Sequence, residues 1–267
     1  SQMDSFDPKP LLAKYHGKTL PARSPETENM TGGAFASPFK FKPYGESGIE
    51  VSDLFPHIGK VIDKMCVIRS MHTDSVTHTP SLMMMNSGTL TQTTPAMGSW
   101  VTYGLGTENQ SLPGFVVLCP GGLPIAGPNN WRSAFLPSVY QGTLVDNDNT
   151  DVESLIADIR NRKIGSAQQR RQLDLLQQLN LQHRHRTGAD DAMDARIKSY
   201  ELAYRMQASA SDAFDIGREP AYIREAYGDS AQGRQLLIAR RLVERGVRFV
   251  QSWHGKPQPW VNLWQWE

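Results

Sequence analysis

The chain has 267 residues, of which 39% are hydrophobic, so it is long enough to bury a substantial core. Its 28 lysines and arginines nearly balance 27 acidic residues, and a net charge of +1 gives no global field that attracts nucleic acid or an anionic membrane. No apolar run approaches the roughly 18 residues that span a bilayer, and Cys66 and Cys119 lie in apolar runs that predict buried free thiols.

The first 50 residues contain many prolines and glycines without a hydrophobic period, which predicts an irregular segment. The stretch 51–65 then places apolar residues on one face of a predicted helix, with Ser52 or Asp53 as its N-cap. Residues 65–70, MCVIRS, predict a short buried strand. A second helix is expected within 80–88, with Pro80 in its first turn and Gly88 at its end.

Strands and helices alternate through the rest of the chain. Residues 114–119, GFVVLC, predict another buried strand. From 151 to about 245 the pattern is helical and charged, and Gly188 divides it into an expected antiparallel hairpin that projects from the main body. The last helix is expected to end near Arg245, with Gly246 as a left-handed stop and 247–251 as a strand. This alternation predicts an α/β fold, with a parallel-rich sheet flanked by helices.

The same pattern suggests one domain overall, built in three parts. Residues 1–150 comprise the irregular N-terminal segment and an α/β core, and 151–245 form the helical insertion. Residues 246–267 supply a final core strand and a tail with four tryptophans. These divisions follow composition shifts and turn residues along the chain.

Three polar segments follow the predicted strands. They are MHTDSVTHT after CVIRS, PGGLPIAGPNNW after FVVLC, and WHGKPQPW after RFVQ. Ligands of open α/β sheets bind outside the carboxyl ends of the strands. If the strands are parallel, His72, Asp74, His78 and His254 converge on one crevice.

Imidazole and carboxylate groups hold zinc, manganese or iron, and such a metal polarises an ester oxygen or activates a bound water. The spacing His-x-Asp-x-x-x-His matches no strict metal signature. The alternative is that Asp74 and Thr77 cap the next helix while the histidines bond to backbone groups. Spacing alone leaves both interpretations open.

Several motifs in one order also carry a family resemblance. They are SQMDSFDPKPLLAKYHGK, IRSMHTDSVTHTPSLMMMNSG, PGFVVLCPGGLP with GPNNWRSAFLPSVYQGT, and RFVQSWHGKPQPW. Together they resemble a bacterial sulfatase-like family of unknown function, placed with the alkaline-phosphatase/sulfatase superfamily. The resemblance implies a parallel-rich α/β sandwich, export to the periplasm for the parent family, and hydrolysis of phosphate or sulfate esters with bound metal ions.

The resemblance also assigns candidate residues. It places Ser1 and Asp4 at the polar end of the family's first strand, where a nucleophile and metal ligands are expected, and the loop 72–78 after its second strand. It implies Ser1, Asp74 and His78 as catalytic residues. It implies Asp4, His72, His78 and His254 as ligands of a divalent zinc, calcium or manganese ion. Arg69, Trp253 and Trp260 are candidate substrate-binding residues.

The sequence departs from the family pattern at both ends. The expected Gly-Gly-Pro strand before Ser1 and the Asp-x-His element after Trp260 are absent, and the chain ends in VNLWQWE. We therefore expect a family member truncated at both ends, whose incomplete sheet exposes an edge for pairing with a second copy.

Three functions remain open. The first is a metal-assisted hydrolase of phosphate or sulfate esters, with a small-molecule or saccharide ester as its substrate. The second is a glycoside hydrolase that uses two carboxylates among Asp4, Asp7, Asp53 and Asp74, with the tryptophans as a sugar platform. The third is a non-catalytic fragment that keeps the fold alone. None of the three calls for nucleic acid or a membrane as a partner.

Overall fold

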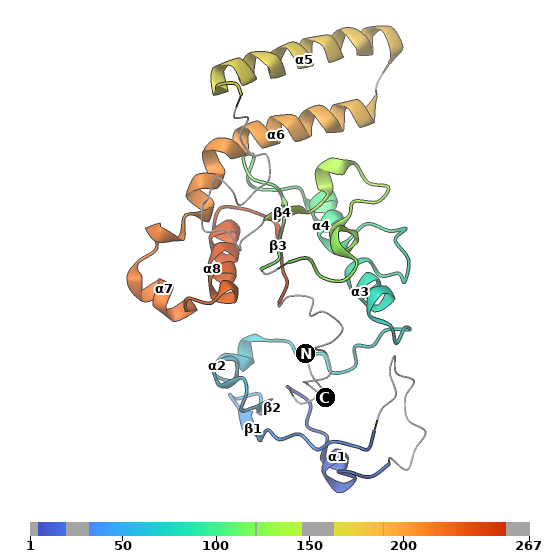
Figure 1. The fold of residues 1–267 in the computed structure, drawn as a ribbon, viewed down its shortest axis with the longest axis vertical. Coiled ribbons are helices and arrows are strands. Elements are labelled where there is room, and N and C mark those ends of the chain that lie inside the picture. Colours follow the sequence, from blue (N-terminus) through green and yellow to red (C-terminus); the bar gives the residue numbers. More distant parts are fainter. Residues whose placement is uncertain (1–4, 20–31, 121, 146–162, 189, 255–267) are drawn as a thin grey trace. The chain divides into compact units, whose positions relative to one another are not determined.

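The computed structural model describes residues 5–19, 32–120, 122–145, 163–188 and 190–254 (Figure 1). By its internal contacts the chain divides into two compact units, an N-terminal unit of residues 1–77 and a C-terminal unit of residues 78–267. The finer division expected at residues 150 and 245 stays a prediction. None of the helices in the described ranges combines the length and apolar character that crossing a bilayer requires.

The N-terminal unit is built around an antiparallel hairpin. Strands β1 (Phe41–Tyr44) and β2 (Ile49–Ser52) pair with Phe41 opposite Ser52. In the turn between them Gly45 and Gly48 have φ of +62° and +64°, values that glycine adopts without strain. The carboxylate of Asp63 accepts the backbone N–H groups of Glu46 and Ser47, both at 2.9 Å, and so fixes the turn.

Short helical segments complete this unit. Helix α1 spans Pro10–Lys14 and α2 spans Pro56–Gly59, and a 3-10 turn follows at Ile62–Lys64. Rings of Phe6 and Phe55 stack with centroids 5.7 Å apart.

Two expectations for residues 51–70 are wrong. The predicted helix over 51–65 is interrupted because Val51 and Ser52 belong to β2, and α2 begins at Pro56, whose ring suits the first turn of a helix. Residues 65–70 form no strand and are mostly exposed, with Ile68 62% accessible, because no described strand pairs with them. Cys66 is therefore exposed rather than buried, whereas Cys119 is buried as predicted.

The C-terminal unit contains the parallel sheet that the sequence predicts. Strand β3 (Phe115–Leu118) lies between β4 (Thr143–Val145) and β5 (Phe249–Ser252), and both neighbours run parallel to it. In the register, Leu118 lies beside Val145 on one side and Ser252 on the other. The α/β class is confirmed. Within the described residues β4 and β5 are the edge strands, and pairing of an edge with a second copy stays a prediction.

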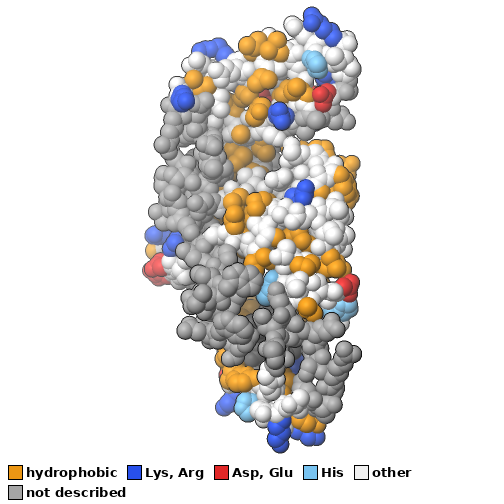
Figure 2. Space-filling model, turned by 45° about the vertical axis from the view of Figure 1, so that its right-hand side comes forward, with side chains coloured by type: hydrophobic (Ala, Val, Ile, Leu, Met, Phe, Trp, Pro, Cys, Tyr) orange, Lys and Arg blue, Asp and Glu red, His pale blue; other side chains and the backbone are white. Residues whose placement is uncertain are grey.

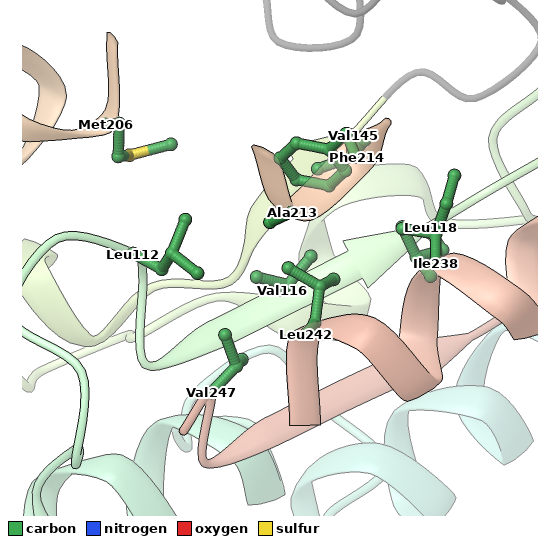
Figure 3. Close-up of a cluster of buried hydrophobic side chains, with 10 residues drawn as sticks. All are labelled: Leu112, Val116, Leu118, Val145, Met206, Ala213, Phe214, Ile238, Leu242 and Val247. Atoms are coloured by element: carbon green, nitrogen blue, oxygen red, sulfur yellow. The ribbon is translucent and has the colours of Figure 1, made fainter. Parts of the chain in front are cut away.

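Side chains alternate between the two faces of this sheet. On one face Val116 and Leu118 pack against Leu242 and Ile238 of the last helix and against Phe214 (Figure 3). On the other face Phe115, Val117 and Cys119 pack with Trp131 and Ala96. Because β3 is central and buried on both faces, its residues form the continuous apolar run seen in the sequence.

The helices of this unit mostly follow the sequence prediction. Helix α3 begins two residues before the expected position, and Gly88 after it has φ of +76°. Ser230 caps the last helix, α8, by accepting the N–H of Gly233 at 3.0 Å, and Gly246 follows that helix with φ of +82°. The helices are α3 (His78–Ser87), α4 (Met97–Leu105), α5 (Ser166–Thr187), α6 (Asp191–Phe214), α7 (Ala221–Tyr227) and α8 (Ala231–Glu244).

The predicted helical hairpin is formed by α5 and α6 (Figure 1). Arg170 of α5 donates two hydrogen bonds to Glu201 of α6, at 2.8 and 2.6 Å, and this partner lowers the pKa of the Glu201 carboxyl. Arg184 and Asp194 form a second ion pair at 3.1 Å nearer the turn. In the described ranges, 3-10 turns at Gly127–Trp131, Ser138–Tyr140 and Ile216–Arg218 also contribute to the connections.

Candidate functional site

The carboxyl ends of β3 and β5 lie side by side, because the two strands are parallel and in register up to Leu118 and Ser252. Gln235 of α8 fixes this edge. Its Nε2 has two hydrogens to share among three acceptors, the carbonyl oxygens of Leu118 and Trp253, each at 3.0 Å, and Oγ of Ser252 at 2.5 Å. Gln235 is fully buried, and its Oε1 has no partner among the described residues. Two of the three expected segments therefore leave the sheet at the same edge.

His254 lies just beyond this edge. It follows Trp253, and its Nδ1 is 3.1 Å from Oε1 of Gln232 on α8. The residue is exposed, and its Nε2 has no hydrogen-bond partner in the described part of the chain. This arrangement holds one ring nitrogen and leaves the other available to a bound molecule.

A cavity of about 300 Å³ lies beside edge strand β5. Its polar wall is a chain of amides. Nε2 of Gln251 donates to Oδ1 of Asn86 at 2.6 Å, and Nδ2 of Asn86 lies 3.3 Å from Oδ1 of Asn130. Asn130 is fully buried and donates in turn to the carbonyls of Ile125 and Gly127, both at 2.9 Å.

One acceptor in this wall is unused. Oε1 of Gln251 is buried and has no hydrogen-bond partner among the described residues. A buried amide oxygen without a partner costs about 1–3 kcal/mol, so it favours a ligand or water that donates a hydrogen bond to it. The other lining residues are Met85, Ala96, Met97, Gly98, Phe249, Val250 and Ser252.

The candidate residues from the sequence are distributed over both units. Arg69, His72 and Asp74 belong to the N-terminal unit and are exposed, while His78 opens α3 in the C-terminal unit. Ser1, Asp4 and Trp260 lie outside the described residues. Trp253 packs against Trp131 with ring centroids 6.5 Å apart, and its Nε1 is buried with no partner described.

The prediction that His72 and Asp74 lie at the carboxyl edge of the sheet required a strand at residues 65–70, and these residues form no strand. The hydroxyls of this loop instead bond to one another. Oγ of Ser75 lies 3.1 Å from Oγ1 of Thr77, and Oγ1 of Thr73 accepts the N–H of Ser75 at 3.1 Å. These hydroxyl groups thus stabilise the local conformation of the loop.

The described residues do not fit a metal ion. No group of three histidine, cysteine, aspartate or glutamate side chains within them is placed to hold one. The cavity beside β5 offers amide oxygens and nitrogens, and none of its described lining residues is an acid. We therefore derive no metal-dependent step from these residues.

Two possible nucleophiles in the C-terminal unit are also inactive in this geometry. Burial raises the pKa of the Cys119 thiol to about 12, so the thiol stays protonated at neutral pH. Ser99 is fully buried in α4 and its hydroxyl donates to the carbonyl of Arg132 at 3.2 Å. Neither residue presents a free nucleophile to the cavity.

The sequence interpretation missed Asn86, Asn130, Gln235 and Gln251. A signal existed for Gln235, since it lies on the apolar face of α8 with Ile238 and Leu242, where a polar residue needs a buried partner. Gln251 likewise interrupts the apolar strand that follows Gly246. Asn86 and Asn130 carry no such signal, because asparagine is common near helix ends and in loops.

Comparison with known proteins gives one result. The family described as "Protein of unknown function (DUF1501)" matches residues 1–266. No curated protein and no solved structure matches the chain. The match covers nearly the whole chain, and nothing in it connects the chain with sulfatases or alkaline phosphatases.

Proposed function

The chain belongs to this family of proteins of unknown function, and we propose that it takes part in the hydrolysis of phosphate or sulfate esters. In this proposal the alcohol half of the substrate binds in the amide-lined cavity beside β5. The family resemblance described from the sequence motivates the choice of reaction. The observation that carries the proposal is the buried amide oxygen of Gln251 in this cavity, which has no partner among the described residues; His254 follows the lining residue Ser252 by two positions and is held on the side of α8.

The cavity suits an oxygen-rich group. Gln251 Oε1 accepts a hydrogen bond from a hydroxyl of the substrate, because no described residue gives that oxygen a donor. A volume of about 300 Å³ corresponds to a small molecule such as a monosaccharide. The amides bind such a molecule without an added charge, so the alcohol half is recognised by its hydroxyls.

His254 supplies proton transfer. It lies two residues beyond the lining residue Ser252, which is about 7 Å along an extended chain. Imidazole both donates and accepts a proton near neutral pH. In this role the imidazolium gives its Nε2 proton to the leaving alcohol oxygen as the ester P–O or S–O bond breaks, water supplies the oxygen that replaces it, and the proton that this water releases restores the imidazolium. Gln232 holds the ring through Nδ1.

A glycoside hydrolase is less well supported. That reaction needs two carboxyl groups roughly 5–10 Å apart on either side of the scissile bond. None of the described residues that line the cavity is an aspartate or a glutamate. Asp7, Asp53 and Asp74 belong to the other unit, and Asp4 lies outside the described residues.

The test is turnover of p-nitrophenyl phosphate and p-nitrophenyl sulfate by the purified chain, with elemental analysis of the same sample. We expect His254→Ala to lower kcat by about 100-fold or more, as for loss of a general acid. We expect Gln251→Ala to act mainly on KM, raising it by about tenfold through loss of one hydrogen bond. His183→Ala, which removes an exposed imidazole on α5, is the matched control and leaves both constants unchanged.

Two outcomes reject the proposal. One is the absence of turnover of either ester, with or without added zinc, calcium or manganese. The other is turnover that His254→Ala leaves at the wild-type rate. Cleavage of p-nitrophenyl glycosides in place of the esters supports the glycoside hydrolase, and no turnover of any of these substrates supports a non-catalytic role.

A further inference from the structure

A second cavity lies at the opposite end of the sheet from His254. Its volume is about 390 Å³, and Gly114, which precedes β3, is part of its wall. The 3-10 turn Ser138–Tyr140, which leads into β4, forms another part, and this turn contacts both α4 and α6. The cavity therefore belongs entirely to the C-terminal unit and shares no lining residue with the cavity beside β5.

One wall of this cavity is positively charged. Lys198 and Arg205 of α6 both line it, and a separation of seven residues places them about two turns apart on one face of that helix. Neither side chain forms a hydrogen bond or a close ion pair within the described part of the chain, although the charge of Arg205 helps to lower the pKa of the Glu201 carboxyl. The nearby acid Glu201 is already bound by Arg170, and none of the described lining residues is an acid.

Another part of the lining is apolar and partly aromatic. It comprises Leu112, which is 1% exposed, Val139 and Tyr140. From Tyr140 a row of aromatic contacts continues outward over α4. Tyr140 meets Tyr103 edge-on at 5.3 Å, and Tyr103 meets Trp100 at 6.2 Å. Trp100 and Tyr103 are 44% and 51% exposed. Other hydrophobic side chains also reach the surface of the protein (Figure 2).

The loop between these walls is held in place before any ligand arrives. Oδ1 of Asn109 accepts the N–H groups of Ser111 and Leu112, at 2.7 and 2.9 Å. Its Nδ2 donates to the carbonyl of Arg245 at 2.6 Å, which ties the loop to the end of α8. A cavity whose wall is fixed in this way loses little conformational entropy on binding.

We propose that this cavity binds a small amphipathic organic anion, with its carboxylate, sulfonate or phosphate head on Lys198 and Arg205. The apolar body of the ligand lies against Leu112, Val139 and Tyr140. Two cations that form no hydrogen bond with the described residues favour an anionic head, since their N–H donors stay free for a ligand. An inorganic anion alone is a poorer ligand, because it has no apolar body and leaves the apolar wall exposed to water. The proposal goes beyond ester hydrolysis and does not depend on it.

The experiment is isothermal titration of the purified chain with naphthalene-2-sulfonate, whose carbon–sulfur bond is not an ester and is not cleaved. Naphthalene-2-sulfonamide is the neutral comparison, and inorganic phosphate is the anion without an apolar body. We expect the sulfonate to bind at least about tenfold more tightly than either, because only it satisfies both walls.

Variants then locate the site. We expect Lys198→Gln with Arg205→Gln to weaken sulfonate binding by about tenfold, a value set by two partly solvated charges. Arg196→Gln, on α6 but outside the cavity lining, is the matched control and changes the affinity less than about twofold. Val139→Trp fills the cavity and abolishes binding without changing the charge. Raising the salt concentration weakens the wild-type affinity toward that of the double variant.

Results of three kinds overturn the proposal. They are no sulfonate binding at millimolar concentration, equal binding of the sulfonate and the neutral sulfonamide, and an unchanged affinity in the double charge variant. The two charge changes are at exposed positions, so circular dichroism is expected to show a folded protein in each case. If Val139→Trp fails to fold, the charge variants and the neutral comparison still decide the question.

Discussion

The two units of the chain are stabilised in different ways. In the described part of the N-terminal unit only two large apolar side chains, Val51 and Ile62, are buried. The C-terminal unit buries both faces of a parallel sheet, with Val116, Val117 and Leu118 at 0% exposure. A small apolar core leaves a unit marginally stable, so the hairpin of the first unit depends on its turn and on Asp63. The hydrophobic content of the sequence alone therefore does not show where the core of this chain lies.

The largest expected effect comes from a buried ion pair of the C-terminal unit. Arg241 is 3% exposed, pairs with Glu219, and donates to the carbonyls of Ala213 and Asp212 at 3.0 and 2.7 Å. Glu219→Ala leaves that charge buried without its partner, and we expect a loss of about 3–5 kcal/mol in the free energy of unfolding. Chemical denaturation followed by tryptophan fluorescence measures it, because every tryptophan of the sequence lies after residue 77.

The control is an exposed ion pair on the same helix. Arg240 and Glu244 of α8 are 2.7 Å apart with half-exposed side chains. Glu244→Ala is expected to cost about 0.5 kcal/mol or less, as is usual for solvated pairs. Equal losses of stability for the two variants would mean that Arg241 is solvated in solution. The C-terminal unit would then not be packed at this position.

The two thiols give the next largest effect, with one in each unit. Cys66 is exposed, whereas Cys119 is 5% exposed and burial raises its pKa to about 12. At pH 8 we expect a thiol reagent such as dithionitrobenzoate to modify Cys66 at least about 100-fold faster than Cys119, which reacts only on opening of the core. Mass spectrometry of the labelled peptides separates the two sites. Comparable rates would contradict the burial of Cys119 at the end of β3.

The raised pKa of Cys119 also has a consequence for stability. The unfolded thiol ionises near its usual value of 9.0, while the folded thiol keeps its proton until about pH 12. Between these values the folded state holds the extra proton, so this contribution to stability is complete below about pH 9 and is lost as the pH rises. Cys119→Ala removes that dependence, and Cys66→Ala is the control that leaves it intact.

The same contrast explains how far the sequence predicts the fold. The hairpin of α5 and α6 and the succession of α8, Gly246 and β5 were predictable, because each combines a long pattern with a glycine stop. The central strand was predictable from its short continuous apolar run. The run 65–70 is also mostly apolar but pairs with no strand among the described residues. Whether a neighbouring strand exists is a property of the whole fold, so a short apolar run cannot report it.

The candidate site was less predictable than the fold. The parallel order of β3 and β5 was expected, and with it the position of His254 at their carboxyl ends. The amides that form the cavity were not, because Asn86 and Gln251 are 165 residues apart and meet only in the folded chain. The charged cavity has the same origin, since its cations lie on α6 and its apolar wall comes from residues 112–140.

The smallest expected effect concerns the turn of the N-terminal hairpin. Gly45 and Gly48 have nearly the same positive φ, but their surroundings differ. An added Cβ at Gly48 meets nothing within 4 Å, so Gly48→Ala carries only the backbone strain of roughly 1–2 kcal/mol. At Gly45 the added atom lies 2.2 Å from Oδ2 of Asp63, whose carboxylate has to move away from the N–H groups of Glu46 and Ser47. The difference between these variants measures what Asp63 contributes to the turn.

We expect Gly45→Ala to be more destabilising than Gly48→Ala, because the displaced Asp63 carboxylate loses its hydrogen bonds from the N–H groups of both Glu46 and Ser47. Amide hydrogen exchange at Glu46 and Ser47 is the measurement, because it reports on this turn directly. Hydrogen bonds to this carboxylate lower the pKa of Asp63, the side chain of Ser47 being the largest contributor. A carboxyl group whose pKa is lowered by folding stabilises the folded state at pH values above its pKa in the unfolded chain. The protection of these amides is therefore lost as the pH falls through the lowered pKa of Asp63 in the folded protein. Equal rates of amide hydrogen exchange in both variants at neutral pH would show that the Asp63 carboxylate does not hold the turn. The stability of the N-terminal unit would then not depend on this carboxylate.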